Sequence, residues 1–532
     1  MRPTPATRPS PEGPPGPAPP QPAPPQPAPP QGPAPPQGPA PPSGPARSGP
    51  VGPSSRARPT ARPPLTPPGP SSGEWLSGAA ARGVAWMGME RWIDHVLSTG
   101  VFVVLGRLLL PSAFGLVAAA SVVILFLRVL VDLGFSRALV QRREITEDHV
   151  DTAFWTSVAA GAVFTVAVAA GAPLIALLYS QPALTNVVRA LSLVFVFAAL
   201  DTTQSALVER WLNFRVQAVR RLAANAAAAG VAVGLAVTGA GVWALVAQAL
   251  VLEAVTVTLL WRMVSWRPRW RFSRASFADL ASFGGRYSVL RVMWFLSGNV
   301  DDFLIGVFLG PLALGYYVIA YRVLVIFDEL FAKTISRVSL TTYSKLQADR
   351  ERLHEAFYKS VGMASTVGLP AYAGLALVAP QLVPLVFGAK WAPSVAVMQA
   401  LAVVGMIRCS SAFNHSLVLS IGKVRAELRW SIATTTLVVA AFASSVHFGI
   451  VAVALGLVAV NLLLWPVRVL RLHYLTGIAV RRYAGRYLAP VPATAAMVAA
   501  VLAAGWGVRG HGDLATLGAE VVAGIVVYPL AL

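Results

Sequence analysis

The sequence predicts an all-α polytopic membrane protein with about fourteen transmembrane helices, arranged as two six-helix lobes followed by two C-terminal helices. Hydrophobic residues make up 55% of the 532 residues and charged residues only 12%, and the mean hydropathy is +0.61. A soluble domain carries about twice that share of charge. Apolar runs long enough to cross a bilayer follow one another, and part of the first half recurs in the second. These observations place the chain in a membrane.

Residues 1–83 are predicted to form a Pro-rich, disordered cytoplasmic tail. Near-repeats such as PAPPQ and GPAPPQ contain almost no large apolar side chains, so they cannot bury enough surface to offset the entropy of ordering. The tail could be a polyproline ligand for a partner domain or a plain low-complexity extension. Its scattered arginines and its lack of an early apolar core are unlike a cleavable signal peptide.

From Trp86 onward, apolar runs of about 18 to 25 residues are each long enough to cross a hydrocarbon layer of about 30 Å. The expected spans are centred near Val103, Leu125, Val163, Phe195, Val231, Leu252, Leu296, Leu324, Val367, Val404, Val438, Leu457, Met497 and Val522. The expected parts are an N-lobe over residues 84–265, an interfacial linker over 266–284, a C-lobe over 285–474 and two helices over 475–532. The last two helices lie outside the repeated region.

Basic residues alternate between the predicted connections. Clusters such as 267–274 and 481–486 fall on one side, whereas the loops on the other side contain Lys390 and Arg509. Because Lys and Arg collect in cytoplasmic loops, this pattern places both termini in the cytoplasm. The same rule accounts for the net charge of +20 without nucleic acid as a partner. The aromatic and basic linker is expected at the lipid interface rather than on a nucleic acid.

The two predicted lobes are related by an internal duplication. Corresponding residues lie 200 positions apart, and they are Gly106 and Gly306, Pro111 and Pro311, Ala113 and Ala313, Gly115 and Gly315, and Ala120 and Ala320. Because six spans separate the copies, the lobes share one orientation and an axis along the membrane normal should relate them. The chain is organised around the second copy, residues 297–321, where an Asn and two Asp interrupt an apolar run.

Several segments occur in an order that resembles a known family. They are RLLLPSAFGLVAAASVV (107–123), DLGFSRALVQRREIT (132–146), TAFW (152–155), GAGVWALVAQ (239–248), SGNVDDFLIGVFLGPLALGYY (297–317) and SKLQADRERL (344–353). Residues 84–475 resemble the polysaccharide exporters and oligosaccharide flippases of the MOP superfamily, especially the WzxC-type lipopolysaccharide biosynthesis branch. The resemblance implies two lobes around a cavity that opens alternately to each side and moves an undecaprenyl-pyrophosphate-linked glycan outward. The Pro-rich tail and Arg128 depart from the family pattern.

Charged side chains within the spans indicate where a site lies, because each costs about 2.5 to 3.5 kcal/mol at mid-bilayer without a partner or a wet cavity. Arginine offers paired donors that match phosphate oxygens. The candidate substrate-binding residues are Arg107, Arg128, Arg291, Asn299 and Arg322. The candidates for ion coupling or cavity lining are Asp132, Asp301 and Asp302. The structural alternative is a set of internal ion pairs, such as Arg128 with Asp132 four residues on.

The motifs of other function classes are absent from the sequence. It has no nucleotide-binding loop, no nucleophile elbow and no metal-spaced His and Cys cluster, so we expect no cofactor, no metal and no ATP hydrolysis. We expect a bacterial plasma-membrane translocase for a lipid-linked oligosaccharide, with membrane lipids and other polysaccharide assembly proteins as its expected partners. A glycan polymerase or ligase would need a longer outer loop with catalytic side chains. A MATE-like drug exporter would favour carboxylates over arginines in its cavity.

Overall fold

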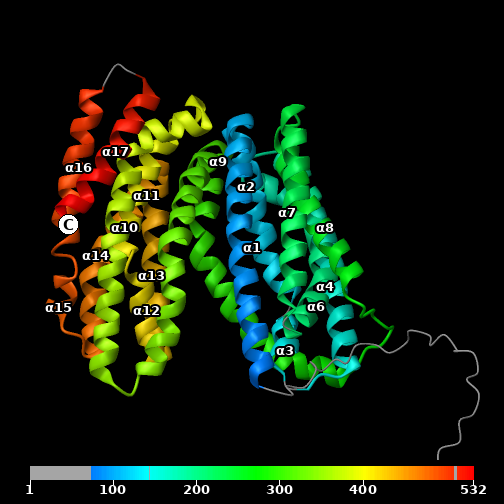
Figure 1. Ribbon diagram of the computed structural model, residues 1–532. Helices are drawn as coiled ribbons and strands as arrows, with labels where there is room; N and C mark the ends of the chain where they lie inside the picture. The colour runs from blue at the N-terminus through cyan, green and yellow to red at the C-terminus, as the bar shows by residue number, and fades with distance from the viewer. Residues whose placement is uncertain (1–72, 133, 143, 212, 509–511) are drawn as a thin grey trace, which may run out of the picture. The chain divides into compact units, whose positions relative to one another are not determined.

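The computed structural model describes residues 73–532 except 133, 143, 212 and 509–511. Side chains within helices are not described for residues 73–89, 214, 283–294, 296–297, 330–338 and 412. Most of the predicted tail therefore lies outside the described residues. In the part that is described, every regular element is a helix (Figure 1), which confirms the predicted all-α class.

The helices that precede the linker form what we call the N-lobe. They are α1 (Gly73–Leu108), α2 (Pro111–Val131), α3 (Phe135–Gln141), α4 (Glu147–Leu178), α5 (Leu184–Ser192), α6 (Val194–Arg210), α7 (Phe214–Val237) and α8 (Val242–Met263). Pro111 opens α2 at a position where its missing N–H costs nothing, so α1 and α2 turn within two residues. This tight turn agrees with the short connection expected at Pro111.

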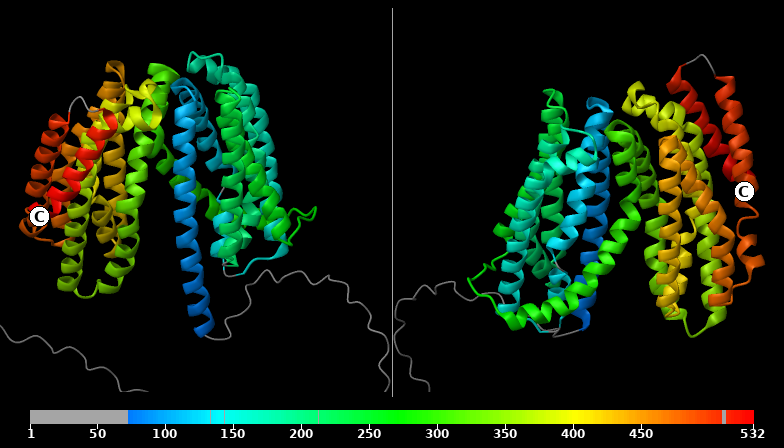
Figure 2. Two further views of the ribbon diagram at one scale, coloured as in Figure 1. Left: turned by 45° about the horizontal axis from the view of Figure 1, so that its top comes forward. Right: turned by 180° about the vertical axis from the view of Figure 1, so that it is seen from behind.

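Helix α9 (Arg274–Leu346) runs between the N-lobe and the helices that follow it, and Figure 2 shows the same arrangement from two further sides. It contains a kink at Gly310, which has φ 80° and ψ 175° and bends the chain just before Pro311. A side chain other than glycine would be strained in this conformation. The kink lies between Leu296 and Leu324, the centres of the two spans predicted here.

The helices after α9 form what we call the C-lobe and a C-terminal pair. The C-lobe contains α10 (Arg350–Phe387), η1 (Ala389–Trp391), α11 (Ser394–Arg408), α12 (Ser411–Ser420), α13 (Val424–Ser445), η2 (Val446–Phe448) and α14 (Ile450–Thr476). The short helix α15 (Val480–Gly485) leads to the pair α16 (Pro490–Gly507) and α17 (Asp513–Ala531). Both helices of the pair pack against α10.

Eleven helical stretches in the described part of the chain are long and apolar enough to cross a membrane. Helices α1 and α7 and residues 274–297 of α9 are also long, but they are not among those eleven. The predicted count of fourteen spans therefore stays a prediction. The multi-span membrane architecture itself is confirmed.

The two lobes meet at the end of the molecule where α2 begins, which we call the closed end and define by Pro111, Pro311 and Trp391. One apolar core there contains Phe114 of the N-lobe together with Trp391 of the C-lobe. Farther along the helices each lobe has its own core, one around Phe154 and another around Phe357. The lobes therefore share buried surface at the closed end and have separate cores at the opposite end.

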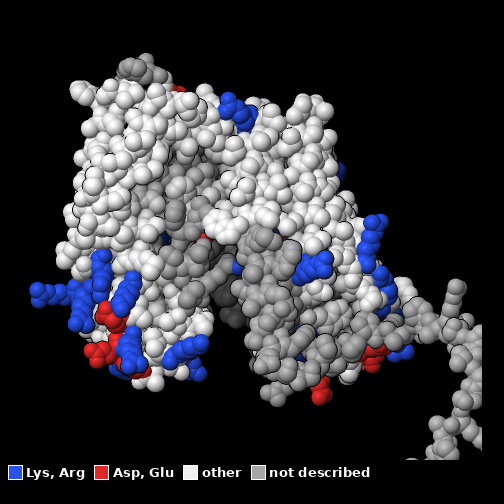
Figure 3. All heavy atoms as spheres, in the orientation of Figure 1, with Lys and Arg blue, Asp and Glu red and all other residues white. Residues whose placement is uncertain are grey.

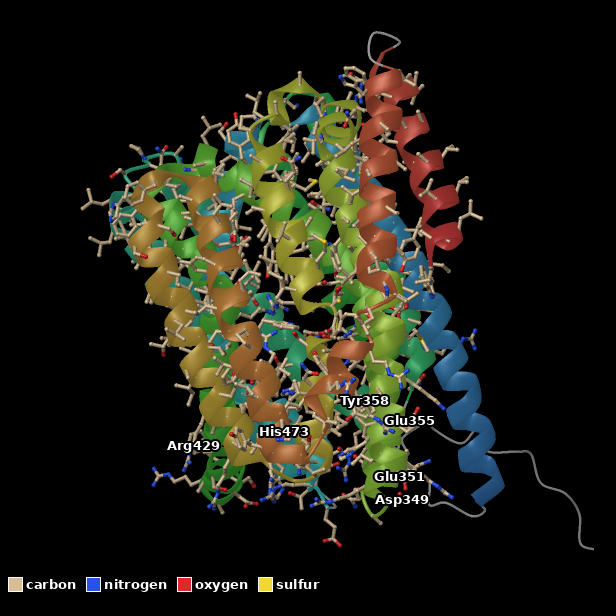
Figure 4. The ribbon with its side chains drawn as sticks, turned by 90° about the vertical axis from the view of Figure 1, so that its left-hand side faces the viewer. Asp349, Glu351, Glu355, Tyr358, Arg429 and His473 are labelled. Atoms are coloured by element: carbon tan, nitrogen blue, oxygen red, sulfur yellow. The ribbon has the colours of Figure 1, made fainter. Side chains whose placement is uncertain are left out.

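The opposite end carries most of the exposed basic side chains, and we call it the basic end (Figure 3). Figure 4 shows Asp349, Glu351, Arg429 and His473 gathered there. Arg468 lies inside α14. The aliphatic part of an Arg side chain tolerates an apolar setting while its charged head reaches a polar one.

Candidate functional site

Three cavities border α9, and all are lined partly by charged side chains. The N-lobe cavity, about 600 Å³, includes Phe295 and Asn299 of α9. The α1 cavity, about 260 Å³, includes Arg322. The C-lobe cavity, about 280 Å³, includes Asp301 and Tyr321. The segment around which the sequence is organised therefore contributes a wall to each cavity.

Ion pairs already occupy most of the charges in the N-lobe cavity. Arg128 of α2 makes a two-fold contact with Glu253 of α8, in which one of the two nitrogen-to-oxygen distances is 3.1 Å. Arg220 of α7 pairs with Asp201 of α6 at 3.1 Å. These pairs join neighbouring helices of one lobe, which is the structural alternative considered for intramembrane charges.

Asp132 lies at the end of α2 and borders the N-lobe cavity. Its carboxylate accepts hydrogen bonds from the Ser136 backbone N–H at 3.0 Å and from the Ser136 hydroxyl at 2.7 Å. It thereby satisfies a free N–H in the first turn of α3, as capping carboxylates do. The pair of Arg128 with Asp132, considered as the structural alternative to substrate binding, is replaced by the ion pair of Arg128 with Glu253, from a distant part of the chain. Asn299 also borders this cavity, and its amide donates to the Phe295 carbonyl at 2.9 Å.

The α1 cavity has an apolar wall and one exposed guanidinium. Side chains of α1, including Leu97, Val101 and Phe102, face Arg322 of α9 across it. Among the described residues, no hydrogen bond or ion pair engages the Arg322 side chain. Seven residues farther along α9, Glu329 lies 3.2 Å from His95 of α1. The cavity therefore combines an apolar lining with a positive charge that is free to bind an anion.

The C-lobe cavity is lined by α9, α11, α13 and α14. Asp301 is 7% exposed and accepts a hydrogen bond from the Tyr317 hydroxyl at 2.8 Å. Two arginines, Arg408 and Arg468, border the same cavity. Arg468 donates to the Ser411 hydroxyl at 2.6 Å. Arg408 stands out in the sequence as a charge within a predicted span, but neither arginine is among the substrate-binding residues predicted from the sequence.

Two other candidates are not among the described residues that line these cavities, and a third lies outside the described side chains. Arg107 lies at the closed end, where it donates to the Leu385 carbonyl at 2.7 Å. Asp302 is half-buried beside Asp301 on α9. Arg291 belongs to the stretch of α9 whose side chains lie outside the described residues. Their assignment to binding or coupling stays a prediction.

The linker is fixed to the N-lobe at the basic end by a polar and aromatic cluster. The Trp155 ring stacks on Trp270 with centroids 4.0 Å apart, and its N–H donates to the Arg269 carbonyl at 2.7 Å. Asp279 contacts Arg142, and it lies 3.2 Å from Nε2 of His149. Hydrogen bonds from Arg142 first and His149 second lower the pKa of the Asp279 carboxyl below its ordinary value.

No group of three or more His, Cys, Asp or Glu side chains is placed to hold a metal ion within the described ranges. The cavities offer guanidinium, amide and hydroxyl groups instead. Such groups bind phosphate, carboxylate and sugar hydroxyls.

The fold is that of a polytopic membrane protein built from two related lobes. Two solved structures share this fold. The inward closed structure of the lipid II flippase MurJ superposes with a TM-score of 0.69 at 12% identity, covering 84% of this chain and 98% of that one. An inward-facing MATE family multidrug resistance transporter of the MOP superfamily superposes with a TM-score of 0.58 at 18% identity, covering 75% and 99%.

Sequence comparison identifies the family. Residues 104–396 match the model of a family described as polysaccharide biosynthesis protein, and the chain belongs to that family. It is similar to the lipopolysaccharide biosynthesis protein WzxC of Escherichia coli, with 29% identity over 72% of this chain and 78% of that protein. It is also similar to the teichuronic acid biosynthesis protein TuaB of Bacillus subtilis, with 26% identity over 65% and 72%. The resemblance inferred from the sequence is confirmed.

Proposed function

We propose that this protein moves a lipid-linked oligosaccharide from the cytoplasmic face to the outer face of the bacterial plasma membrane. The carrier lipid in this proposal is undecaprenyl diphosphate, and transport proceeds by alternating access without an enzymatic step. The observation that carries the proposal is the α1 cavity, where an apolar wall faces the exposed Arg322 guanidinium. An isoprenoid chain suits the wall, and a diphosphate suits the guanidinium.

The difference in charge between the two ends of the molecule indicates the direction of transport. The basic end faces the cytoplasm in this proposal because Lys and Arg favour that side, and both termini lie there. The closed end then faces outward, and the cavities are reached from the cytoplasm. Membership of a polysaccharide biosynthesis family supports a glycan as cargo. Other polysaccharide assembly proteins would then act on the delivered glycan outside.

The energy source in this proposal is an ion gradient. The sequence contains no nucleotide-binding loop. Asp301, buried beside the Tyr317 hydroxyl, is the carboxylate placed best to exchange a proton or a cation as the C-lobe moves. Asp302 and Asp132 remain further candidates. A MATE-like exporter of cations is a weaker second candidate, because the α1 cavity presents an arginine to its cargo.

A vesicle assay with defined lipid-linked sugars tests the proposal. Purified protein is reconstituted with a fluorescent undecaprenyl-diphosphate disaccharide, and an enzyme outside the vesicle reports the sugar that reaches its side. Wild type is expected to speed translocation, and Arg322→Gln to slow it by roughly 10- to 100-fold, since a charge-assisted hydrogen bond is lost. Arg352→Gln, at an exposed arginine of the basic end, is the matched control. Arg291→Gln tests the site predicted from sequence alone.

A wild-type protein that moves no lipid-linked sugar under any ion gradient would refute the proposal. So would a chromosomal deletion strain that delivers its glycan outward at the normal rate, provided that no second transporter of this family is present.

A further inference from the structure

The C-lobe cavity contains more positive charge than its own carboxylate neutralises. Arg408 of α11 and Arg468 of α14 both border it, together with Asp301. In the described residues no carboxylate forms an ion pair with either arginine, and Asp301 accepts from the Tyr317 hydroxyl instead. Two guanidinium groups that border one cavity without a described carboxylate partner are suited to an anionic ligand.

The rest of the lining is suited to sugar hydroxyls. One face of α13 presents Ser431, Thr434 and Thr435, and α14 adds the Asn461 side chain. Asn461 uses one amide hydrogen on the Leu457 carbonyl at 2.9 Å, which leaves its second hydrogen and its oxygen for a ligand. Arg468 uses one of its five N–H donors on Ser411. The polar part of the lining therefore offers hydroxyl and amide groups beside two cations.

The α1 cavity and the C-lobe cavity differ in the charge and polarity of their linings, so each suits a different part of one cargo. The α1 cavity has one arginine and an apolar wall, which suits the diphosphate and the tail of a carrier lipid. The C-lobe cavity has two arginines among hydroxyl and amide groups. Tyr321 and Arg322, adjacent on α9, border the C-lobe cavity and the α1 cavity respectively. Successive side chains of a helix point about 100° apart, so the two cavities flank α9 on different sides.

We propose that the C-lobe cavity is a subsite for an acidic sugar of the transported glycan, and that Arg408 and Arg468 bind its carboxylate. This inference rests on the proposed function, because it takes a lipid-linked glycan as cargo. It adds that this cargo is anionic in its sugar part as well as in its diphosphate. Arg408 provides the exposed, unshared guanidinium, and Ser411 orients Arg468 toward the same anion.

The test measures binding of three probes to the full-length protein in lipid nanodiscs. The probes are undecaprenyl diphosphate, undecaprenyl diphosphate with a neutral disaccharide, and the same carrier with a disaccharide that ends in glucuronic acid. Arg408→Gln and Arg468→Gln are each expected to weaken binding of the glucuronic acid probe by roughly 10- to 100-fold. Binding of the other two probes is expected to stay within about twofold of wild type. Arg429→Gln, an exposed arginine of α13 outside the cavity lining, should change none of the three.

A competition experiment on the wild-type protein separates the two possible sources of the anion without any substitution. Free glucuronate should displace the glucuronic acid probe to the level of the neutral probe and leave the neutral probe bound. Displacement of the neutral probe by glucuronate would overturn the inference, because the acid would then be competing for the diphosphate site. Equal losses for all three probes in Arg408→Gln and Arg468→Gln would also overturn it.

The outcomes distinguish this inference from the proposed function. If wild type binds the neutral and acidic probes equally, the subsite is refuted and the flippase proposal stands. If wild type binds none of the three, both are refuted. Arg408→Lys retains the charge and should recover part of the lost affinity for the acidic probe, whereas a purely structural role for Arg408 would not depend on the probe's carboxylate.

Discussion

Gly115 of α2 lies directly against the backbone of Pro311 in α9, so a methyl group at Gly115 would be only 1.6 Å from the Pro311 carbonyl oxygen. The reverse contact is nearly the same, because a methyl group at Gly315 would be 2.0 Å from the Pro111 oxygen. The two copies of the internal repeat therefore pack on each other. Reciprocal contacts of this kind are what an approximate two-fold axis through the closed end produces.

Gly115→Ala is expected to prevent full closure of this end. The obstacle is backbone, which cannot rotate away, and overpacking costs about 1 to 3 kcal/mol, equivalent to a shift of roughly 5- to 150-fold toward the open arrangement. Closure can be measured by cross-linking Arg107→Cys to Lys390→Cys. In the native protein, the Lys390 ammonium group donates a hydrogen bond to the Arg107 backbone carbonyl at 2.8 Å. The single natural cysteine, Cys409, is 5% exposed and can be replaced first.

Gly171→Ala is the matched control for that experiment. Gly171 lies within α4, and a methyl group there would have open space around it. The substitution should leave cross-linking unchanged and raise stability by up to about 1 kcal/mol. Equal cross-linking in Gly115→Ala and wild type would show that the close contact of α2 with α9 at Gly115 is not needed for closure.

Trp391→Phe is expected to weaken the closed end without creating a clash. The Trp391 N–H donates to the Gly106 carbonyl at 2.8 Å, and the ring packs against Phe114. Phenylalanine retains most of the ring but not the donor, so the closed arrangement should lose about 1 kcal/mol. We expect the equilibrium constant for closure, measured by cross-linking, to fall roughly fivefold. An unchanged equilibrium would show that this hydrogen bond contributes nothing to closure.

Arg128 and Glu253 permit a direct test of two roles for Arg128. Glu253→Gln leaves the Arg128 charge without its partner. We expect the free energy of unfolding to fall by about 2 kcal/mol, less than for a fully buried pair because Arg128 is partly exposed to solvent. The double variant Arg128→Gln, Glu253→Gln should recover much of that loss, which a double-mutant cycle measures.

Transport by the same double variant separates the alternatives. A stable double variant that still transports at the wild-type rate would assign Arg128 to holding α2 against α8. A stable double variant that fails to transport would assign it to the cargo. The N-lobe pairs Arg220 with Asp201 in a comparable position, so Asp201→Asn provides an internal reference.

The contact of Asp279 with Arg142 and His149 should make linker docking depend on pH. Because these hydrogen bonds lower the Asp279 pKa, the ionised form favours the docked linker. The resulting stability is present at neutral pH and above the ordinary aspartate value, and it is lost as the pH falls through the lowered pKa. Pepsin, which is active in acid, should therefore cut the linker progressively faster as the pH falls through that range.

Asp279→Asn provides the comparison for the pH experiment. Its linker should be released more readily at neutral pH, and the acid-dependent part of the release should be absent. Identical pH profiles for wild type and Asp279→Asn would show that another group controls docking.

Much of the architecture could be predicted from the sequence because it depends on local chemistry. Apolar run lengths predict spans, and the repeated Pro111 and Pro311 predict corresponding turns. The sequence did not predict that the two repeats would touch at Gly115 and Gly315. That contact depends on how two helices approach, and helix patterns carry little information about it.

The site was predicted less completely, for a physical reason that Arg128 illustrates. A spacing of four shows which groups can meet on one helix, but it does not show which competing partner is stronger. Asp132 is drawn to the free N–H at the start of α3, and Glu253 from α8 reaches Arg128 instead. Arg107 likewise donates to a carbonyl in the last turn of α10, where the carbonyls have no partner within their own helix.

Because α9 supplies part of the wall of all three cavities, they cannot change shape independently. A rotation of this one element would alter the space in all three cavities in the same motion. Under the proposed function, a lipid head, a sugar and a coupling ion would therefore act on one another through the position of α9, which bends at Gly310.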